Sequence, residues 1–136
     1  MRARTVVCLL LLVGCSRREQ QLSPRHIEAP FYPQLARMAR IQGKVVLLMT
    51  IDSNGNVIDA KRTNDDKSHP LLKINAIDNI RHWTFENPSS ARRTQTITYD
   101  YGIDESRPPT SIQTTTVTYD LPDRVTILTN APEVNP

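Results

Sequence analysis

Cysteine is almost absent from this sequence of 136 residues, and both of its cysteines lie near the start of the chain. Cys8 lies inside an apolar run, and Cys15 follows that run directly. No disulfide can therefore form within the rest of the chain, and no cysteine is left there to act as a nucleophile or a metal ligand.

The motifs of catalysis and metal binding are also lacking. None of the three histidines has a second ligand at a metal-binding spacing, and Asp65-Asp66 lacks the spacing of an oxygen-ligand loop. Asp78 and His82 stand four residues apart on a predicted helix, where we interpret them as a surface pair. No nucleophile-elbow serine and no glycine-rich phosphate loop is present. We therefore expect a protein that is not an enzyme and uses no cofactor or metal.

A strong excess of one charge is missing as well. The chain has 17 Lys and Arg residues against 14 Asp and Glu residues, a formal net charge of +3. Arg2 and Arg4 belong to a segment that we predict to be removed, which leaves 15 basic against 14 acidic residues. This balance offers no electrostatic footprint for a phosphate backbone, so we expect no nucleic-acid partner.

The apolar run Val6–Gly14 is too short to cross a bilayer. Its nine residues cover about 14 Å of helix, against a hydrocarbon core of about 30 Å. Because two arginines precede it, the run is typical of a signal peptide over residues 1–14. It ends in Leu12-Val13-Gly14-Cys15, which resembles the lipobox of bacterial lipoproteins, where the cysteine thiol receives a diacylglycerol. We prefer lipidation of Cys15 over an ordinary cleavage site, because no other role for this cysteine is visible.

The rest of the chain divides by composition. Residues 15–28 are polar and charged, and we predict a short tether between a lipid and a domain. Residues 29–106 carry the periodic apolar patterns of a folded domain. Residues 107–136 hold five of the ten prolines and are rich in threonine, so we predict a tail with at most a loose edge hairpin.

Helical periodicity appears twice within residues 29–106. The first predicted helix has Pro33 in its first turn and ends near Gly43. The second begins after an N-cap at Ser68 and stops at Asn87-Pro88. Its apolar stripe, extended by Ile77, excludes Ile74 and comprises Leu72, Ala76, Ile80 and Trp83.

Alternation of apolar and polar residues predicts three strands. Lys44–Asp52 and Val57–Thr63 form a hairpin, because the Asn-Gly pair in Ser53-Asn54-Gly55-Asn56 favours the positive φ values of a tight turn. Thr94–Asp104 is the third strand, with Ile97, Tyr99, Tyr101 and Ile103 on one face.

Four segments, taken in order, resemble the C-terminal domain of the TonB energy transducers. They are Tyr32-Pro33-x-x-Ala36, Ile41-x-Gly43-x-Val45-x-Leu47, Ile51-Asp52-x-Asn54-Gly55-x-Val57, and Leu72-x-x-x-Ala76-Ile77-x-x-Ile80-x-x-Trp83-x-Phe85-x-x-Pro88. The resemblance covers roughly residues 28–104. It implies an α+β fold with two short helices packed on one face of a three-stranded antiparallel sheet, to which the tail could add a C-terminal hairpin.

The same resemblance implies a binding function. Members of the family bind the N-terminal peptide of outer-membrane transporters beside the last strand, where edge pairing supplies main-chain hydrogen bonds. In this chain the partner, an outer-membrane transporter or another envelope protein, would pair with Thr94–Asp104. The predicted contact residues are Thr96, Ile97, Thr98, Tyr99, Asp100 and Tyr101.

The chain departs from a TonB transducer at its N-terminal end. An apparent lipoprotein signal stands in place of an inner-membrane helix, and the spacer has only about a dozen residues, which reach roughly 45 Å at most. Ser16 differs from the aspartate associated with inner-membrane retention, which favours an anchor in the outer membrane. We expect a periplasm-facing lipoprotein, and the alternative is a structural module that forms a homodimer through the face of Val46 and Leu48.

Two interpretations of the tail stay open. Ser111–Leu121 has the periodicity of a strand, and the short connection Arg107-Pro108-Pro109 lets it fold back onto a free edge of Thr94–Asp104. Alternatively, its prolines and low apolar content leave it disordered, because little burial offsets the entropy of ordering it.

We predict that Cys15 is acylated. Mass spectrometry of the mature protein should find a lipid-modified cysteine as the first residue, and Cys15→Ser should release the protein from membranes or trap its precursor. An unmodified Cys15, or cleavage at another position, would contradict the lipoprotein assignment.

Overall fold

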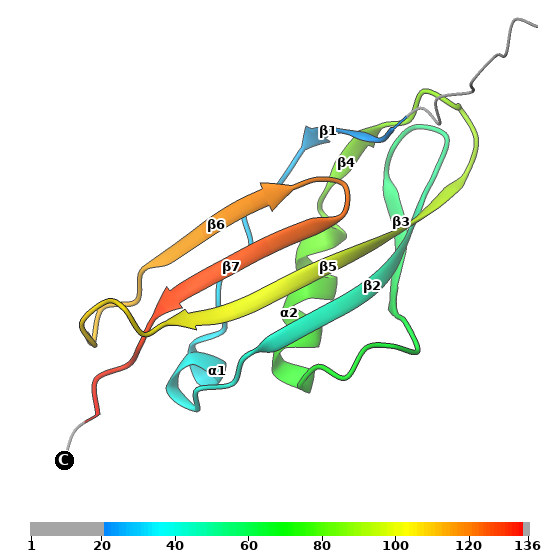
Figure 1. Ribbon diagram of the computed structural model, residues 1–136. Helices are drawn as coiled ribbons and strands as arrows, with labels where there is room; N and C mark the ends of the chain where they lie inside the picture. The colour runs from blue at the N-terminus through cyan, green and yellow to red at the C-terminus, as the bar shows by residue number, and fades with distance from the viewer. Residues whose placement is uncertain (1–20, 135–136) are drawn as a thin grey trace, which may run out of the picture.

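The computed structural model describes residues 21–134. They form an α+β fold in which a five-stranded sheet carries two helices on one face, beside a small two-stranded sheet (Figure 1). The strand order is β3-β2-β5-β7-β6 in the large sheet and β1-β4 in the small one. The predicted fold class is confirmed, although the large sheet has five strands rather than three. The elements are β1 (Ser23–His26), α1 (Gln34–Met38), β2 (Gly43–Ile51), β3 (Val57–Arg62), α2 (Pro70–Ile80), β4 (Thr84–Glu86), β5 (Arg93–Asp104), β6 (Thr115–Asp120) and β7 (Arg124–Asn130).

The predicted β2–β3 hairpin is present and its turn is held from two sides. The Asp52 carboxylate accepts hydrogen bonds from the backbone N–H groups of Asn54 and Asn56, both at 2.9 Å. Gly55 has a φ of 88°, and a Cβ there would lie 1.7 Å from the carbonyl oxygen of Phe85. Only glycine therefore fits this turn, which docks on β4 through a 2.8 Å hydrogen bond from Phe85 N–H to the Gly55 carbonyl.

Helix α2 differs from its prediction at both ends. Its N-cap is His69, whose Nδ1 accepts a hydrogen bond from Leu71 N–H at 3.1 Å, while the predicted cap Ser68 donates instead to Asp66 Oδ1 at 2.7 Å. The helix ends at Ile80 rather than near Asn87. The following residues turn and extend as β4, which pairs with β1, so residues 23–26 are a strand instead of part of the predicted tether.

The buried loop carboxylate of Asp66 fixes the approach to α2. Burial favours a higher pKa for this carboxyl group, but hydrogen bonds from the Ser68 hydroxyl and Val46 N–H, together with Lys73, outweigh that cost. The net pKa lies below its ordinary value, so Asp66 is ionised at neutral pH and paired with Lys73 Nζ at 3.3 Å. Of the Asp65-Asp66 pair, Asp66 thus has a structural role in the loop before α2.

The core lies between the two helices and the sheet. The predicted stripe Leu72, Ala76 and Ile80 is fully buried, whereas Ile74, which the stripe excludes, is 60% exposed. Trp83 is 1% exposed, and its indole N–H donates to the Glu28 carbonyl at 3.0 Å. Neither α1 nor α2, nor any other helix within residues 21–134, is long and apolar enough to cross a membrane.

We predict that Trp83→Ala destabilises the domain by about 3–5 kcal/mol, because it removes a fully buried aromatic side chain and a hydrogen bond. The matched control is Ile74→Ala on the exposed face of α2, which should change the free energy of unfolding by less than about 0.5 kcal/mol. Chemical denaturation of both variants measures the difference. A shift for Trp83→Ala as small as that of the control would show that this indole does not support the core.

Candidate partner-binding edge

Strand β5 contains all of the predicted contact residues, and it lies inside the sheet. It pairs with β2 in antiparallel fashion from Arg93 to Tyr101, and with β7 in parallel fashion from Thr98 to Asp104. The expectation that Thr94–Asp104 is an edge strand is therefore wrong for Thr98–Asp104, whereas Thr94–Ile97 pair within the sheet with β2 alone. Thr98, Tyr99, Asp100 and Tyr101 face β7, whereas Thr96 and Ile97 precede the first residue paired with it.

The tail of the chain fills this edge as a hairpin. The segment beside β5 is β7, whereas Ser111–Leu121, the segment that one interpretation predicts for that place, contributes the outermost strand β6. The order agrees with the apolar content of the two strands, because the strand nearer the centre of the sheet buries more side chain. Val125 and Ile127 of β7 are fully buried in the core, whereas β6 is mostly exposed.

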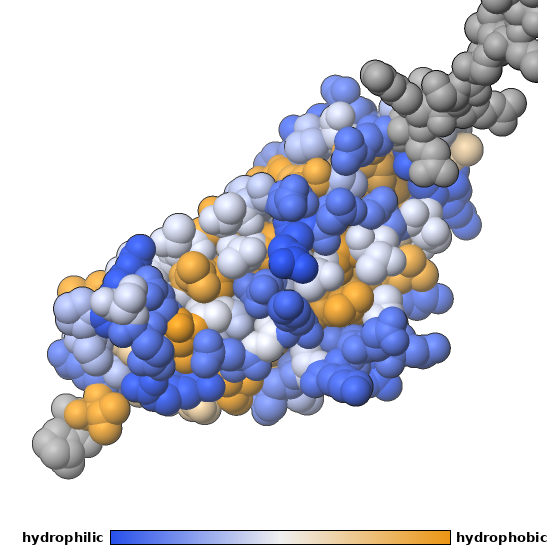
Figure 2. Space-filling model, in the orientation of Figure 1, coloured by the Kyte–Doolittle hydropathy of each residue, from blue (hydrophilic) through white to orange (hydrophobic). Residues whose placement is uncertain are grey.

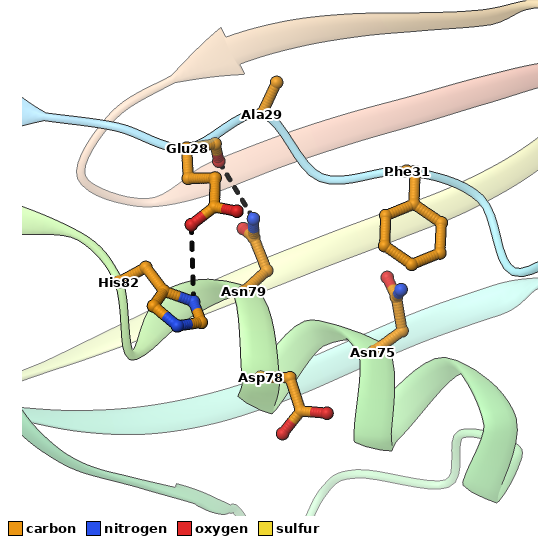
Figure 3. A pocket seen from close by; sticks show the side chains of 7 residues that line it. All are labelled: Glu28, Ala29, Phe31, Asn75, Asp78, Asn79 and His82. Carbon is orange, nitrogen blue, oxygen red and sulfur yellow. Dashed lines mark hydrogen bonds and ion pairs between the residues drawn. The ribbon is translucent and has the colours of Figure 1, made fainter.

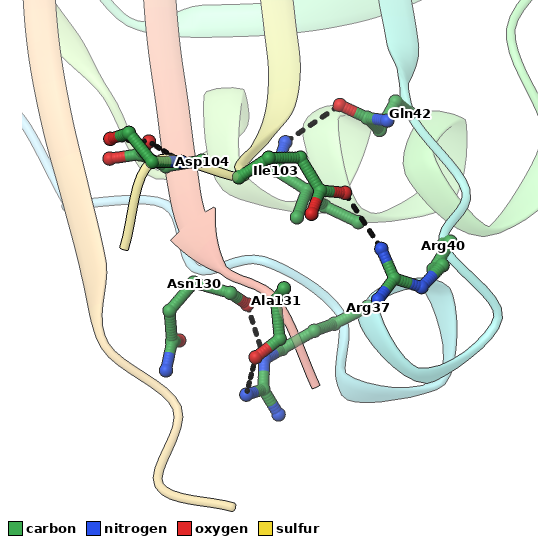
Figure 4. Close-up of polar contacts among 9 residues, drawn as sticks. Arg37, Arg40, Gln42, Ile103, Asp104, Asn130 and Ala131 are labelled. Carbon is green, nitrogen blue, oxygen red and sulfur yellow. Dashed lines mark hydrogen bonds and ion pairs between the residues drawn. The ribbon is translucent and has the colours of Figure 1, made fainter. Parts of the chain in front are cut away.

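A buried arginine joins the tail to the first helix (Figure 4). Arg37 is 1% exposed, and its Nε donates to the Asn130 carbonyl at 2.9 Å. Its Nη2 donates to the carbonyls of Thr110 at 2.6 Å and Ala131 at 3.1 Å. These three bonds hold the segments before β6 and after β7 against α1.

Residue types do not reveal this contact. Helical periodicity predicts that the first helix buries an apolar face, but Leu35 and Met38 are exposed, while Ala36 and Arg37 are buried. The reason is that the acceptors of Arg37 are backbone carbonyls at positions 110, 130 and 131, far away in the chain. Backbone carbonyls leave no trace in residue identity.

The two faces of β5 have different characters. Its predicted apolar face points to the helices, where the hydroxyl of Tyr99 donates to Asn79 Oδ1 at 2.8 Å and that of Tyr101 donates to Asn75 Oδ1 at 2.7 Å. Burial raises the pKa of both hydroxyls, so they remain protonated donors. Burial also raises the pKa of Tyr32 to about 12. Partner contact through Tyr99 and Tyr101 is thus limited to their backbone.

The opposite face of the large sheet is open to solvent. Figure 2 shows this face, on which hydrophilic residues surround small, separate hydrophobic areas. Thr96 is exposed, and Val46, Leu48, Thr98 and Asp100 are half-buried. The face therefore lacks the broad apolar area typical of a stable interface core.

A shallow cavity of about 160 Å³ lies between α2 and the chain segment that precedes α1 (Figure 3). The predicted surface pair of Asp78 and His82 is not formed, because His82 Nδ1 lies 3.3 Å from Glu28 Oε2 instead. The amide of Asn79 donates to the Glu28 carbonyl at 2.9 Å and fixes this segment. Within residues 21–134 no three His, Cys, Asp or Glu side chains come together as a metal site.

The sequence of the domain up to the end of β5 identifies its family. The model of the Gram-negative bacterial TonB protein C-terminal family matches residues 28–104, and the chain belongs to this family. The predicted resemblance is confirmed over the same residues. The β6–β7 hairpin lies beyond residue 104, outside the matched region.

Individual relatives support the assignment. Protein TonB from two Xanthomonas campestris pv. campestris strains, B100 and ATCC 33913, is 33% identical over 64 residues. The match covers 47% of this chain and 28% of each relative, so the chain spans little more than a quarter of their length. The solution NMR structure of the Pseudomonas aeruginosa TonB C-terminal domain has a TM-score of 0.54 and 24% identity. The match covers 67% of this chain and 95% of the Pseudomonas aeruginosa domain, and it shows that the two share a fold.

We predict that Arg37→Met destabilises the protein by about 2–4 kcal/mol, because three backbone carbonyls lose a charged donor. Amide hydrogen exchange should accelerate first in β7. The matched control is Arg40→Met, which removes an exposed ion pair with Glu105 at 2.7 Å and should cost less than about 1 kcal/mol. Equal protection of β7 in both variants would show that Arg37 does not hold the hairpin.

Proposed function

We propose that this chain is a non-enzymatic, lipid-anchored protein of the bacterial envelope that takes part in TonB-type transport. Its domain binds an extended segment of an outer-membrane transporter, or of another envelope protein, by strand addition. Membership of the TonB C-terminal family supports the transport role and the envelope location. The anchor is Cys15, which lies outside the described residues, and the outer membrane is its proposed site.

The observation that carries the binding mode is the pairing of β5 with β7. Strand β7 is an extended segment of the same chain, and it lies beside β5, the last strand of the family domain. It places Val125 and Ile127 in the core, while Thr126 between them faces the open side. The sheet is therefore built to accept a strand whose apolar side chains alternate, which is what a partner segment would supply.

The proposed contact residues Thr96–Tyr101 are accessible to a partner along their whole length only after the hairpin leaves. Departure would expose the Val125 and Ile127 side chains, at about 1.5–3 kcal/mol each, and would break the three bonds of Arg37. To bind there, a partner must offset this free-energy cost by burying its own apolar side chains in the same place. Binding at Thr96–Tyr101 thus requires strand exchange, in which the hairpin acts as a competitor.

The second candidate function is self-association through Val46 and Leu48. Both side chains are half-exposed on the open face of β2. Against this candidate, the apolar areas of that face are small and divided (Figure 2). A homodimer through this face would be weak.

Crosslinking in intact cell envelopes tests the proposed function. We expect the mature protein to crosslink to an outer-membrane transporter, and a synthetic peptide copying the transporter's N-terminal segment to bind the purified chain in calorimetry. Crosslinks to a second copy alone, lost in the double variant Val46→Lys and Leu48→Lys, would support the self-associating module instead. Crosslinks to an enzyme complex would make the chain an accessory of that enzyme and contradict the proposal.

A further inference from the structure

Within residues 21–134, the large sheet ends in two strands that each pair on one side only. Strand β3 pairs with β2, and β6 pairs with β7. On the free side of such a strand, every second residue points its N–H and C=O groups away from the sheet. A strand can be added there without displacing any part of the chain.

The β3 edge carries the features that prevent pairing. Asp59, Lys61 and Arg62 are charged, which makes three of the six residues of this strand charged. The register with β2 also shifts between Thr50 and Ile51, which bends the edge. Charges and irregularities of this kind discourage the addition of another strand.

The β6 edge has fewer of these features. Its one charged residue, Asp120, ends the strand, while Thr115–Tyr119 carry no charge and no proline. The strand also keeps a regular register with β7 over all six residues. Four of the six residues are β-branched, a composition that favours extended pairing. Of the two edge strands of the large sheet, β6 is therefore the one whose composition favours pairing with an added strand.

A partly covered aromatic row continues to this edge on the helix side of the sheet. The ring centroids of Tyr99 and Trp83 lie 6.0 Å apart, and those of Trp83 and Tyr119 lie 6.1 Å apart. The first two rings are buried, whereas Tyr119 is 40% exposed. An added strand with an apolar side chain on this side would cover Tyr119 and extend the core by one position.

We propose that the outer edge of β6 is the surface on which an extended partner segment adds to this protein. The segment is uncharged, has apolar residues at alternate positions and comes from another protein. This inference rests on the proposed function and moves its binding site from Thr96–Tyr101 to the β6 edge. The hairpin fills the edge at Thr98–Asp104 and provides a new edge two strands further out, so binding requires no strand exchange.

Edge variants test the proposal with a defined probe, a fluorescent ten-residue peptide of alternating valine and threonine that carries a solubilising tail. Fluorescence anisotropy with the full mature chain should show binding, and hydrogen exchange should slow at the outward amides of Thr115–Asp120. Tyr119→Lys and Thr118→Lys should each weaken the affinity about tenfold or more, because a charge at the edge opposes pairing. The exposed Thr118 serves as the second variant if Tyr119→Lys disturbs the Trp83 contact.

The matched control is Ile58→Lys on β3, where the side chain is 48% exposed and the new charge is the same. It should leave peptide binding unchanged, and loss of binding in this variant would place the site at β3 and overturn the proposal. A peptide affinity that is unchanged in the β6 variants but higher in Arg37→Met would show strand exchange on β5. That result overturns the β6 site and leaves the proposed function intact.

Two further outcomes decide the matter. A dimer in sedimentation experiments that Tyr119→Lys dissociates, without peptide binding, would assign the edge to a second copy and overturn the proposal. Absence of binding to both this probe and the transporter peptide would contradict the proposed function as well as the β6 site.

Discussion

The hydrogen bonds from the Arg37 guanidinium to the carbonyls of Thr110, Asn130 and Ala131 fix both ends of the C-terminal hairpin against the first helix. They join the family domain of residues 28–104 to the hairpin that follows it. A buried cation without a carboxylate partner is stable only when polar acceptors replace its hydration. The carbonyls do so here, and their positions fix where the tail leaves and rejoins the domain.

The added hairpin changes what the domain offers to a partner. With three strands, β5 would end the sheet, and its outward amides would be free. With five strands, the second half of β5 is central, and its Tyr99 and Tyr101 are paired with the buried Val125 and Ile127 of β7. In the same sheet, β7 therefore occupies the position where the family resemblance places the partner segment, and the outer side of β6 is unpaired.

Local signals in the sequence predicted much of this fold. The β2–β3 hairpin follows from the Asn54-Gly55 turn, and the Leu72, Ala76 and Ile80 stripe follows from helical period, since both depend on neighbours in the chain. Strand β1 was missed because its side chains are all exposed and it is held by backbone pairing to β4. The closed edge of β5 was only one of two open interpretations, because strand pairing between residues 98 and 124 depends on topology that residue types do not encode.

The short strand β1 moves the start of the folded domain toward the N-terminus. Leu22 is buried beside it, so the packed domain already includes Leu22. With the proposed lipid on Cys15, the six residues before Leu22 would reach about 20 Å at most, compared with roughly 45 Å for the tether expected from composition. Such an anchor would confine the domain to a thin layer next to the bilayer, where it would meet only partners that present their segment at the membrane surface.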